Sequence, residues 1–165
     1  MIVVFAGSND LSDSFVKLDK ERYHHLVRVL RISKNEKIKI VCEYDEVIFA
    51  TISDIKNDGL EIKQIQRRKK KYSKQLVLVH ALTKKDKFSI ICDYVTQFGI
   101  TDIIPIETER SIVKWDDEKK KKMLAKWREK VLHAAMQSER EEVPHVHEIV
   151  GFKEYVKNIS LKNDQ

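Results

Sequence analysis

Hydrophobic and polar residues alternate with the two-residue period of a β-strand at several places in the first 65 residues of the chain. This alternation predicts strands at 37–41 and 60–65. The apolar run at 2–6 and the mainly apolar segment at 46–52 predict two more strands. A helix is expected to begin after Asp19, because aspartate is a residue type that caps helix N-termini. The apolar face of that helix would comprise Tyr23, Leu26, Val27 and Leu30. Several short strands around one helix predict a small barrel-like β domain.

The pattern changes in the second half of the chain. A continuous apolar run at 76–82 predicts a strand covered on both faces, and 100–106 predicts a second strand. Between them a helix is expected over 86–98, ending before Gly99. Its apolar face would comprise Phe88, Ile91, Tyr94, Val95 and Phe98. A strand, a helix and a strand in this order predict two parallel strands joined by a right-handed crossover.

A basic stretch at 67–74 separates the two patterns. Like charges repel in such a run, which therefore rarely packs and commonly marks a domain boundary. The expected organisation is a β domain over 1–66, a linker over 67–74 and an α/β domain over 75–165. The last of these would also hold a long helix over 116–138 and a short one over 152–159. The predicted fold class is thus α/β plus β.

Composition narrows the partners that the chain can have. Its net charge is +6 and its isoelectric point is near 9.2, which favours a polyanion such as nucleic acid. The two cysteines, Cys42 and Cys92, form no CxxC pair, so no metal site is expected. No apolar run is long enough to suggest a membrane span or a secretion signal. We expect a protein of the reducing cytoplasm.

Two loops that follow the expected parallel strands carry cations, and ligands of open α/β sheets bind at the carboxyl ends of strands. The first loop contains Lys84, Lys85 and Lys87, which could bind phosphate or could simply be solvent-exposed residues at the start of a helix. The second contains Arg110, which could clamp a phosphate with two hydrogen bonds or could pair with a neighbouring glutamate. The residues alone leave both alternatives open.

Three further arginines are candidates for RNA contact. Arg140 follows the long helix, where a cation also stabilises the helix C-terminus, so capping is the plainer interpretation. Arg28 and Arg31 lie three residues apart on the expected first helix and share a face that suits phosphate contact or plain solvent exposure. The sequence contains no GxGxxG motif, no P-loop and no convincing serine- or cysteine-based catalytic group.

Four segments together resemble the family of bacterial 16S rRNA (uracil-N3)-methyltransferases. They are HHLVRVLR at 24–31, ALTKKDK at 81–87, FGITDIIPIETERSIVK at 98–114 and KW…AAMQSEREEVP at 126–144. Their order and spacing match the family along nearly the whole chain. The resemblance implies a PUA-like RNA-binding β domain followed by an α/β domain of the SPOUT class, whose knotted segment binds S-adenosylmethionine.

The resemblance also implies roles for particular residues. The RNA path would include Arg28, Arg31, Lys84, Lys85, Lys87, Arg110 and Arg140. The loops that face the methyl donor would contain Leu82, Thr83, Lys84, Thr108, Glu109 and Arg110. A segment of the dimer-shared active site would contain Gln137, Ser138 and Arg140. The implied reaction is methyl transfer from S-adenosylmethionine to N3 of a uridine in 16S rRNA of the small ribosomal subunit, with no residue assigned as the proton acceptor.

The family's donor site lies in segments that do not occur in residues 1–165. These are a glycine-rich GPEGG segment and a later LG…ILRTETA segment, which belong to the knot. From this we expect residues 1–165 alone to bind the donor poorly and to be inactive. The alternative is a non-catalytic module that binds RNA and dimerises.

Overall fold

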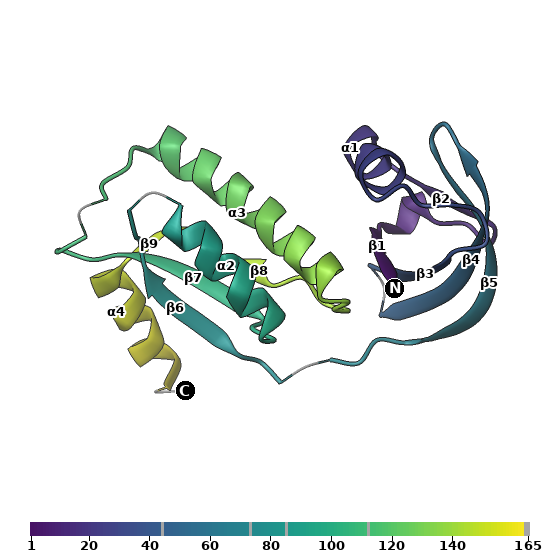
Figure 1. Cartoon of the computed structure of the whole chain (residues 1–165). Helices are drawn as coiled ribbons and strands as arrows, with labels where there is room; N and C mark the ends of the chain where they lie inside the picture. The colour runs from purple at the N-terminus through teal and green to yellow at the C-terminus, as the bar shows by residue number, and fades with distance from the viewer. Residues whose placement is uncertain (44, 73, 85, 112, 164–165) are drawn as a thin grey trace. The chain divides into compact units, whose positions relative to one another are not determined.

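A computed structural model describes residues 1–43, 45–72, 74–84, 86–111 and 113–163. The chain divides into two compact units, Met1–Tyr72 and Ser73–Gln165, and Figure 1 shows a separate β-sheet in each. Each unit also has its own cluster of buried apolar side chains. Each therefore has the separate hydrophobic core that is characteristic of a domain.

The first unit is a curled five-stranded sheet with short helical segments. Its elements are β1 (Ile2–Ala6), η1 (Ser8–Asp10), β2 (Phe15–Lys17), α1 (Lys20–Tyr23), η2 (His24–Val29), β3 (Lys37–Cys42), β4 (Glu46–Lys56) and β5 (Gly59–Lys69). The strand order is β1-β3-β4-β5-β2, with β1 and β3 parallel and the other pairs antiparallel. Two register shifts between β4 and β5 bend these long strands, and Figure 1 shows their curvature. The predicted barrel-like β fold is confirmed.

Inward-pointing strand residues form the core of the first unit. In β4 the side chains of Ile48, Ala50 and Ile52 are fully buried, as the two-residue period of a strand requires. Leu26 of η2 belongs to the same cluster and is also fully buried. Burial of a leucine side chain of this kind stabilises the fold by about 1.5–3 kcal/mol.

The helical segment of this unit differs from the predicted α-helix. Asp19 caps it as predicted, because its carboxylate accepts a hydrogen bond from the Arg22 amide at 2.8 Å. After one turn the helix widens, and the amide of Leu30 donates to the carbonyl of His25, five residues earlier, which is the π-helical pattern. The wider turn rotates Leu30 away from the core. Its predicted place on the buried face is therefore wrong, and it is 48% exposed.

The basic stretch predicted as a linker at 67–74 begins inside the sheet. Its first three residues, Arg67 to Lys69, are the last residues of β5 and pair with the start of β4. The backbone ladder holds them although their side chains repel one another. The guanidinium of Arg68 also lies 5.4 Å from the ring centre of Phe49, a cation–π contact. A linker that starts at residue 67 is therefore wrong.

The second unit is a parallel sheet with helices. Its elements are β6 (Val77–Ala81), α2 (Lys87–Gln97), β7 (Asp102–Glu107), α3 (Asp117–Gln137), β8 (His145–Val146), β9 (Val150–Gly151) and α4 (Phe152–Asn163). β7 is central and pairs in parallel with β6, β8 and β9. The parallel pairing of β6 with β7 across α2 confirms the predicted strand–helix–strand unit. No helix that the structure describes is long and apolar enough to cross a membrane.

Helices pack on both faces of β7. Ile103 is buried in a cluster with residues of α2 and α3, in which the rings of Phe88 and Trp127 lie 4.3 Å apart between centroids. Ile104, the next residue, points to the opposite face. There it lines a cavity together with Tyr155 of α4. Figure 1 shows α2 and α3 side by side and α4 apart from them.

Two predictions about apolar surfaces in this unit are wrong. α2 buries Phe88 and Cys92 as its core face, but Tyr94 and Phe98 are 59% and 82% exposed. Polar Thr96 is buried instead, because its hydroxyl donates to the carbonyl of Cys92 at 2.7 Å. β6 was expected to be covered on both faces, yet it lies at the edge of the described sheet and none of its residues is fully buried. Helical spacing alone does not decide which of two apolar faces meets the sheet.

Candidate active site at the strand ends

The carboxyl ends of three parallel strands meet in the second unit. Ala81 at the end of β6 pairs with Ile106 of β7, and the next amide, that of Leu82, donates to the Ile106 carbonyl at 2.9 Å. On the other side of β7, Val150 of β9 pairs with Ile106. The loops after β6 and β7 and the first turn of α4 therefore begin side by side, as the βα arrangement of open sheets predicts.

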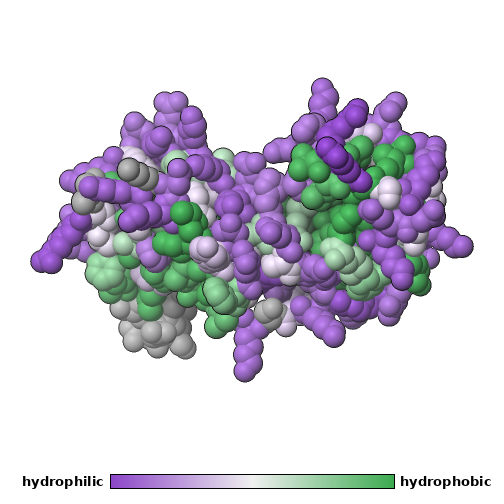
Figure 2. Space-filling model, viewed as in Figure 1, coloured by the Kyte–Doolittle hydropathy of each residue, from purple (hydrophilic) through white to green (hydrophobic). Residues whose placement is uncertain are grey.

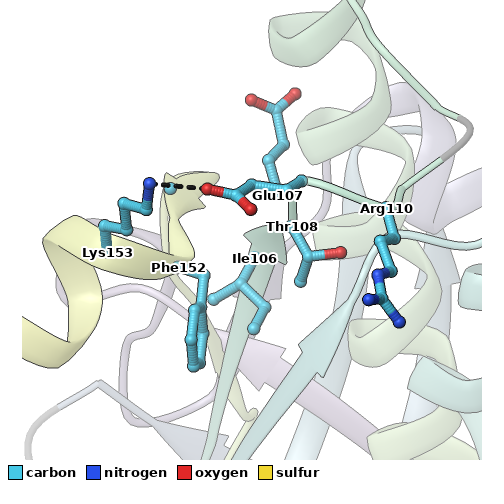
Figure 3. Close-up of a pocket in the computed structure, with 8 residues that line it drawn as sticks. Ile106, Glu107, Thr108, Arg110, Phe152 and Lys153 are labelled. Atoms are coloured by element: carbon cyan, nitrogen blue, oxygen red, sulfur yellow. Dashed lines mark ion pairs between the residues drawn. The ribbon is translucent and has the colours of Figure 1, made fainter.

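A cavity of about 580 Å³ lies at this edge. Its lining residues, most of which Figure 3 labels, are Ile106, Glu107, Thr108, Glu109, Arg110, Gly151, Phe152 and Lys153. Phe152 is 50% exposed at the start of α4, so its ring is accessible to a ligand. The cavity thus combines an apolar wall with charged side chains at its rim.

The turn after β7 holds Arg110 at its tip. The Thr108 amide donates to the Ser111 hydroxyl at 3.2 Å, and the Ser111 amide donates to the Thr108 carbonyl at 3.0 Å. These bonds close the turn on itself. Figure 3 shows the side chain of Arg110 extending from the side of the turn away from Lys153.

The glutamates beside Arg110 are already paired with lysines. Glu107 accepts from Lys120 of α3 at 3.0 Å, and Glu109 accepts from Lys153 of α4 at 2.5 Å. No ion pair of Arg110 occurs among the residues that the structure describes. Arg110 therefore does not pair with a neighbouring glutamate, and the Arg110 guanidinium remains available for an anion.

The loop after β6 places its lysines on the surface. Lys84 is exposed, and Lys87 is exposed as the first residue of α2, while Lys85 lies outside the described residues. Leu82 is buried in the core of the unit. The hydroxyl of Thr83 is buried and makes no hydrogen bond within the described part of the chain. The two loops are thus adjacent, although only the second lines the cavity.

The segment that contains Gln137, Ser138 and Arg140 lies at the other end of the sheet. The Arg140 guanidinium donates to the carbonyls of Thr96 at 2.8 Å and Ile100 at 2.7 Å, at the amino end of β7. A strand as long as β7 separates the two ends by roughly 17 Å. Within one chain, therefore, this segment does not reach the cavity.

The half-buried Arg140 was predicted to cap the C-terminus of the long helix, but its side chain caps a different helix. Its side chain contacts the end of α2. At the end of α3 its backbone amide donates to the Ala135 carbonyl at 2.9 Å, and Ser138 donates its hydroxyl to the Ala134 carbonyl at 2.6 Å. Burial lowers the pKa of the Arg140 guanidinium from its usual value. One of its nitrogens, Nη2, is buried without a hydrogen-bond partner among the described residues.

Arg28 and Arg31 belong to the first unit. Arg28 is exposed in η2, and Arg31 follows the helix with a left-handed backbone, φ +54°. Because η2 is a π-helix and Arg31 lies beyond it, the α-helical i, i+3 relation predicted for this pair is wrong. Their contact with RNA stays a prediction.

Sequence reasoning missed the contribution of Gly151, Phe152 and Lys153 to the cavity. The helix after residue 151 was predicted, but β9 has only two residues and carries no strand pattern of its own. Its pairing with the end of β7 is what brings Phe152 to the cavity. The available signal was Gly151 directly before an apolar helix face.

Two family models match the chain. The model of an RNA methyltransferase domain matches residues 69–164, and the model of an RNA methyltransferase PUA domain matches residues 18–65. The first match covers the cavity and all of α2, α3 and α4 up to residue 163. The second covers most of the curled sheet with its helical segment.

Individual relatives match over most of this chain. Ribosomal RNA small subunit methyltransferase E of Bacillus subtilis is 31% identical over 84% of this chain and 55% of that protein. The protein of the same name from Rickettsia conorii is 28% identical over 93% of this chain and 62% of that protein. A crystal structure of Ribosomal RNA small subunit methyltransferase E from Neisseria gonorrhoeae, bound to S-adenosyl methionine, has a TM-score of 0.79 and 28% identity over 94% of this chain and 64% of that one. The chain spans less than two thirds of the length of each.

Proposed function

The chain belongs to the RNA methyltransferase family, and from this premise we propose that it takes part in methyl transfer from S-adenosylmethionine to N3 of a uridine in 16S rRNA. Membership confirms the family predicted from the sequence, with a PUA-like β domain followed by an α/β domain of the SPOUT type. The observation that carries the proposal is the cavity at the ends of β7 and β9, flanked by Arg110. The matches to methyltransferases do not favour a non-catalytic module.

The residues around the cavity fit a donor of this kind. A volume of about 580 Å³ lies within the usual range of roughly 300–1,000 Å³ for small-molecule sites. Ile106 and the half-exposed Phe152 offer apolar surface for an adenine ring, and a ring pair of this type prefers offset stacking. At Gly151 an added Cβ would meet no atom within 4 Å, so backbone there is open to a ligand. We therefore assign these three residues to a wall of the donor site.

When bound, S-adenosylmethionine supplies the methyl group of its sulfonium: the uridine N3 forms a bond to the methyl carbon, the S–CH₃ bond breaks, and the N3 proton is lost. The chain's contribution to such a displacement is positioning. We assign phosphate binding to Arg110, which the Thr108–Ser111 turn holds out from the sheet. Lys84 of the neighbouring loop and Lys87 at the start of α2 extend this cationic edge, and Leu82 anchors the loop in the core.

We also propose that the chain acts as a homodimer. Trp127 of the long helix α3 is fully buried, so it supplies no contact to a partner chain. Exposed apolar side chains occur elsewhere in the unit, namely Leu76, Val77, Ile90, Tyr94, Phe98, Phe152, Val156 and Ile159. Such an exposed set favours association. A dimer would also provide a route for the segment with Gln137, Ser138 and Arg140 to reach a cavity of the partner chain.

A cytoplasmic location follows from the proposed substrate, because small ribosomal subunits are assembled and used there. RNA contact by the first unit would involve Arg28, which is exposed in η2, and Arg31, which is exposed just after it. Phosphate contacts of this kind position an RNA without reading its sequence.

The proposal is tested by incubating the chain with radiolabelled S-adenosylmethionine and small ribosomal subunits that lack the modification. When the family's GPEGG and LG…ILRTETA segments are supplied in the same protein, we expect label in 16S rRNA, with the methyl group on N3 of a uridine by mass spectrometry of the nucleosides. Residues 1–165 alone are expected to transfer no label. Arg110→Met should lower the rate because one phosphate contact is lost, whereas Lys121→Met, an exposed lysine of α3 outside the cavity, should not. Label on another atom or in another RNA would contradict the proposed specificity.

Donor binding is measured separately by calorimetric titration with S-adenosylmethionine, on the protein that also carries the family's GPEGG and LG…ILRTETA segments, because residues 1–165 alone are expected to bind the donor poorly. Phe152→Ala should weaken binding by about 5- to 10-fold, which corresponds to roughly 1 kcal/mol of ring contact. Phe152→Tyr retains the ring and is the matched control. Equal affinity of Phe152→Ala and the unsubstituted chain would place the donor elsewhere.

A further inference from the structure

A second hollow lies away from the cavity, along the outer side of α3. Its volume is about 670 Å³, and its lining residues are Asp86, Trp115, Lys119, Lys122, Met123, Ala125, Lys126 and Glu129. Lys119, Lys122, Lys126 and Glu129 recur at the three- and four-residue spacing of one helix face. This hollow, which we call the Trp115 groove, therefore follows one side of the helix.

Trp115 is an aromatic wall of the groove that the core supports from behind. Its ring centroid lies 5.9 Å from that of the fully buried Trp127, so the indole is anchored against the core. Trp115 itself is only partly buried and lines the groove. A large ring that remains accessible while the core fixes its position can stack with a planar group at little cost in conformational entropy.

The charge of the groove favours an anion. Lys126 forms an ion pair with Asp86 at 2.6 Å. The remaining charged side chains of the groove are two lysines, Lys119 and Lys122, and one carboxylate, Glu129. Lys119 and Lys122 are exposed and make no ion pair within the described part of the chain. Figure 2 shows hydrophilic residues over the region where Figure 1 draws α3. The groove thus joins free cations with an aromatic ring.

We infer that the Trp115 groove binds a single-stranded segment of RNA, with a base stacked on Trp115 and phosphates on Lys119 and Lys122. Accessible aromatic rings beside cations are the arrangement by which proteins bind single strands. The groove also continues the proposed RNA path, because its wall residue Asp86 directly precedes Lys87 in the loop after β6. The inference rests on the proposed function for the presence of RNA, and it adds a surface outside the proposed donor and phosphate sites.

Intrinsic fluorescence tests the stacking contact, because Trp115 and Trp127 are the two tryptophans of the chain. An oligoadenylate of about eight nucleotides should quench the emission on binding, since the buried Trp127 is out of its reach. Trp115→Leu, which keeps an apolar side chain against Trp127, should weaken binding by about 5- to 100-fold. Trp115→Phe should bind nearly as tightly while abolishing the quench.

Salt dependence tests the phosphate contacts. Replacing Lys119 and Lys122 together by alanine should lower the slope of log affinity against log salt by about 1.4, or about 0.7 for each phosphate contact. Lys121→Ala is the matched control, because it removes the same charge from the same helix but lies outside the groove. An equal effect of Lys121→Ala on slope and affinity would show a diffuse charge effect and overturn the inference.

Further outcomes separate this inference from the proposed function. If the unsubstituted chain binds RNA and Arg110→Met weakens binding while Trp115→Leu does not, the groove inference is wrong and the proposed function stands. If small-subunit RNA is not methylated but the groove variants lose oligoadenylate binding as expected, the proposed function fails and the groove inference stands. Quenching of Trp115 by an oligoglutamate of equal charge would indicate a polyanion or acidic protein surface and overturn the assignment to RNA.

Discussion

Two arginines illustrate how residues of one type differ in their surroundings. Arg110 stands at the tip of a closed turn, and its neighbouring glutamates are paired with Lys120 and Lys153. Arg140 is half-buried and donates to two backbone carbonyls at the end of α2. Both were predicted to contact RNA, and both predictions stand untested. Arg140 also contributes to stability, because its removal takes the side-chain donor from the partly buried Ile100 carbonyl, whereas the Thr96 carbonyl still accepts from the Gly99 amide at 3.2 Å.

Arg140→Met should therefore destabilise the second unit by about 1–3 kcal/mol, the usual cost of unsatisfied buried polar groups. Arg110→Met should change stability by less than about 0.5 kcal/mol, as is typical of surface positions. Urea denaturation followed by tryptophan fluorescence measures both. An Arg140→Met variant of unchanged stability would show that the Ile100 carbonyl finds another donor.

At the scale of elements, the pairing of β2 with β5 requires a glycine at position 59, because a side chain there would collide with β2. Gly59 begins β5 beside β2, and an added Cβ there would lie 2.2 Å from the Val16 carbonyl oxygen and 2.6 Å from Cζ of Phe15. Backbone cannot yield to such a contact without moving the strand.

Gly59→Ala should thus destabilise the first unit by about 1–3 kcal/mol or more through overpacking. Gly151→Ala is the matched control in the second unit, where an added Cβ meets no atom within 4 Å. Thermal unfolding followed by circular dichroism measures the difference. Similar melting curves for the two variants would contradict the close approach of β2.

α2 and α3 are joined by an ion pair between Asp93 and Lys130, 2.8 Å apart. The hydrogen bond from Lys130 is the main cause that lowers the pKa of Asp93 below its usual value. A lowered folded-state pKa contributes stability above the unfolded pKa and loses it as the pH falls through the folded value.

Asp93→Asn should consequently cost up to about 1 kcal/mol at pH 7, because the pair is partly exposed. The difference from the unsubstituted chain should shrink as the pH falls below about 4. Unfolding in urea at pH 7, 5 and about 3 tests this. Lys130→Met should reproduce the same pH dependence, and a loss independent of pH would rule out the ion pair as its cause.

At the scale of the whole molecule, the chain has two separate cores. One cluster surrounds Leu26 and Ile48 in the curled sheet, and the other surrounds Phe88 and Trp127 in the parallel sheet. Both tryptophans lie in the second unit. Tryptophan fluorescence therefore reports the unfolding of that unit, whereas circular dichroism reports both.

Leu26→Ala should destabilise the first unit by about 2–5 kcal/mol, through lost burial and the cavity left behind. The fluorescence-detected transition of the second unit should keep its midpoint, while the circular dichroism transition shifts. Val131→Ala, which truncates a buried side chain of α3, should shift the fluorescence-detected transition and only the second unit's part of the circular dichroism transition. A common shift of both signals would indicate that the two units unfold as one.

The sequence by itself determined the class and order of the main elements. Alternation identified β3 and β5, and apolar segments identified β1, β4, β6 and β7. Asp19, Asp116 and Gly99 marked helix ends. These signals are local, because periodicity and capping depend on residues a few positions apart. The loops that follow β6 and β7 could be predicted as neighbours for the same reason, since parallel pairing was readable from the strand–helix–strand order.

Only the tertiary structure decided which surfaces of these elements are used. The turn at His25 to Leu30 became π-helical, α2 buried Thr96 and exposed Phe98, and β9 brought Phe152 to the cavity. The availability of Arg110 depends on ion pairs from α3 and α4, which are distant in sequence. Such outcomes follow from packing and charge pairing among segments far apart along the chain. A local sequence pattern does not encode which distant segments come into contact.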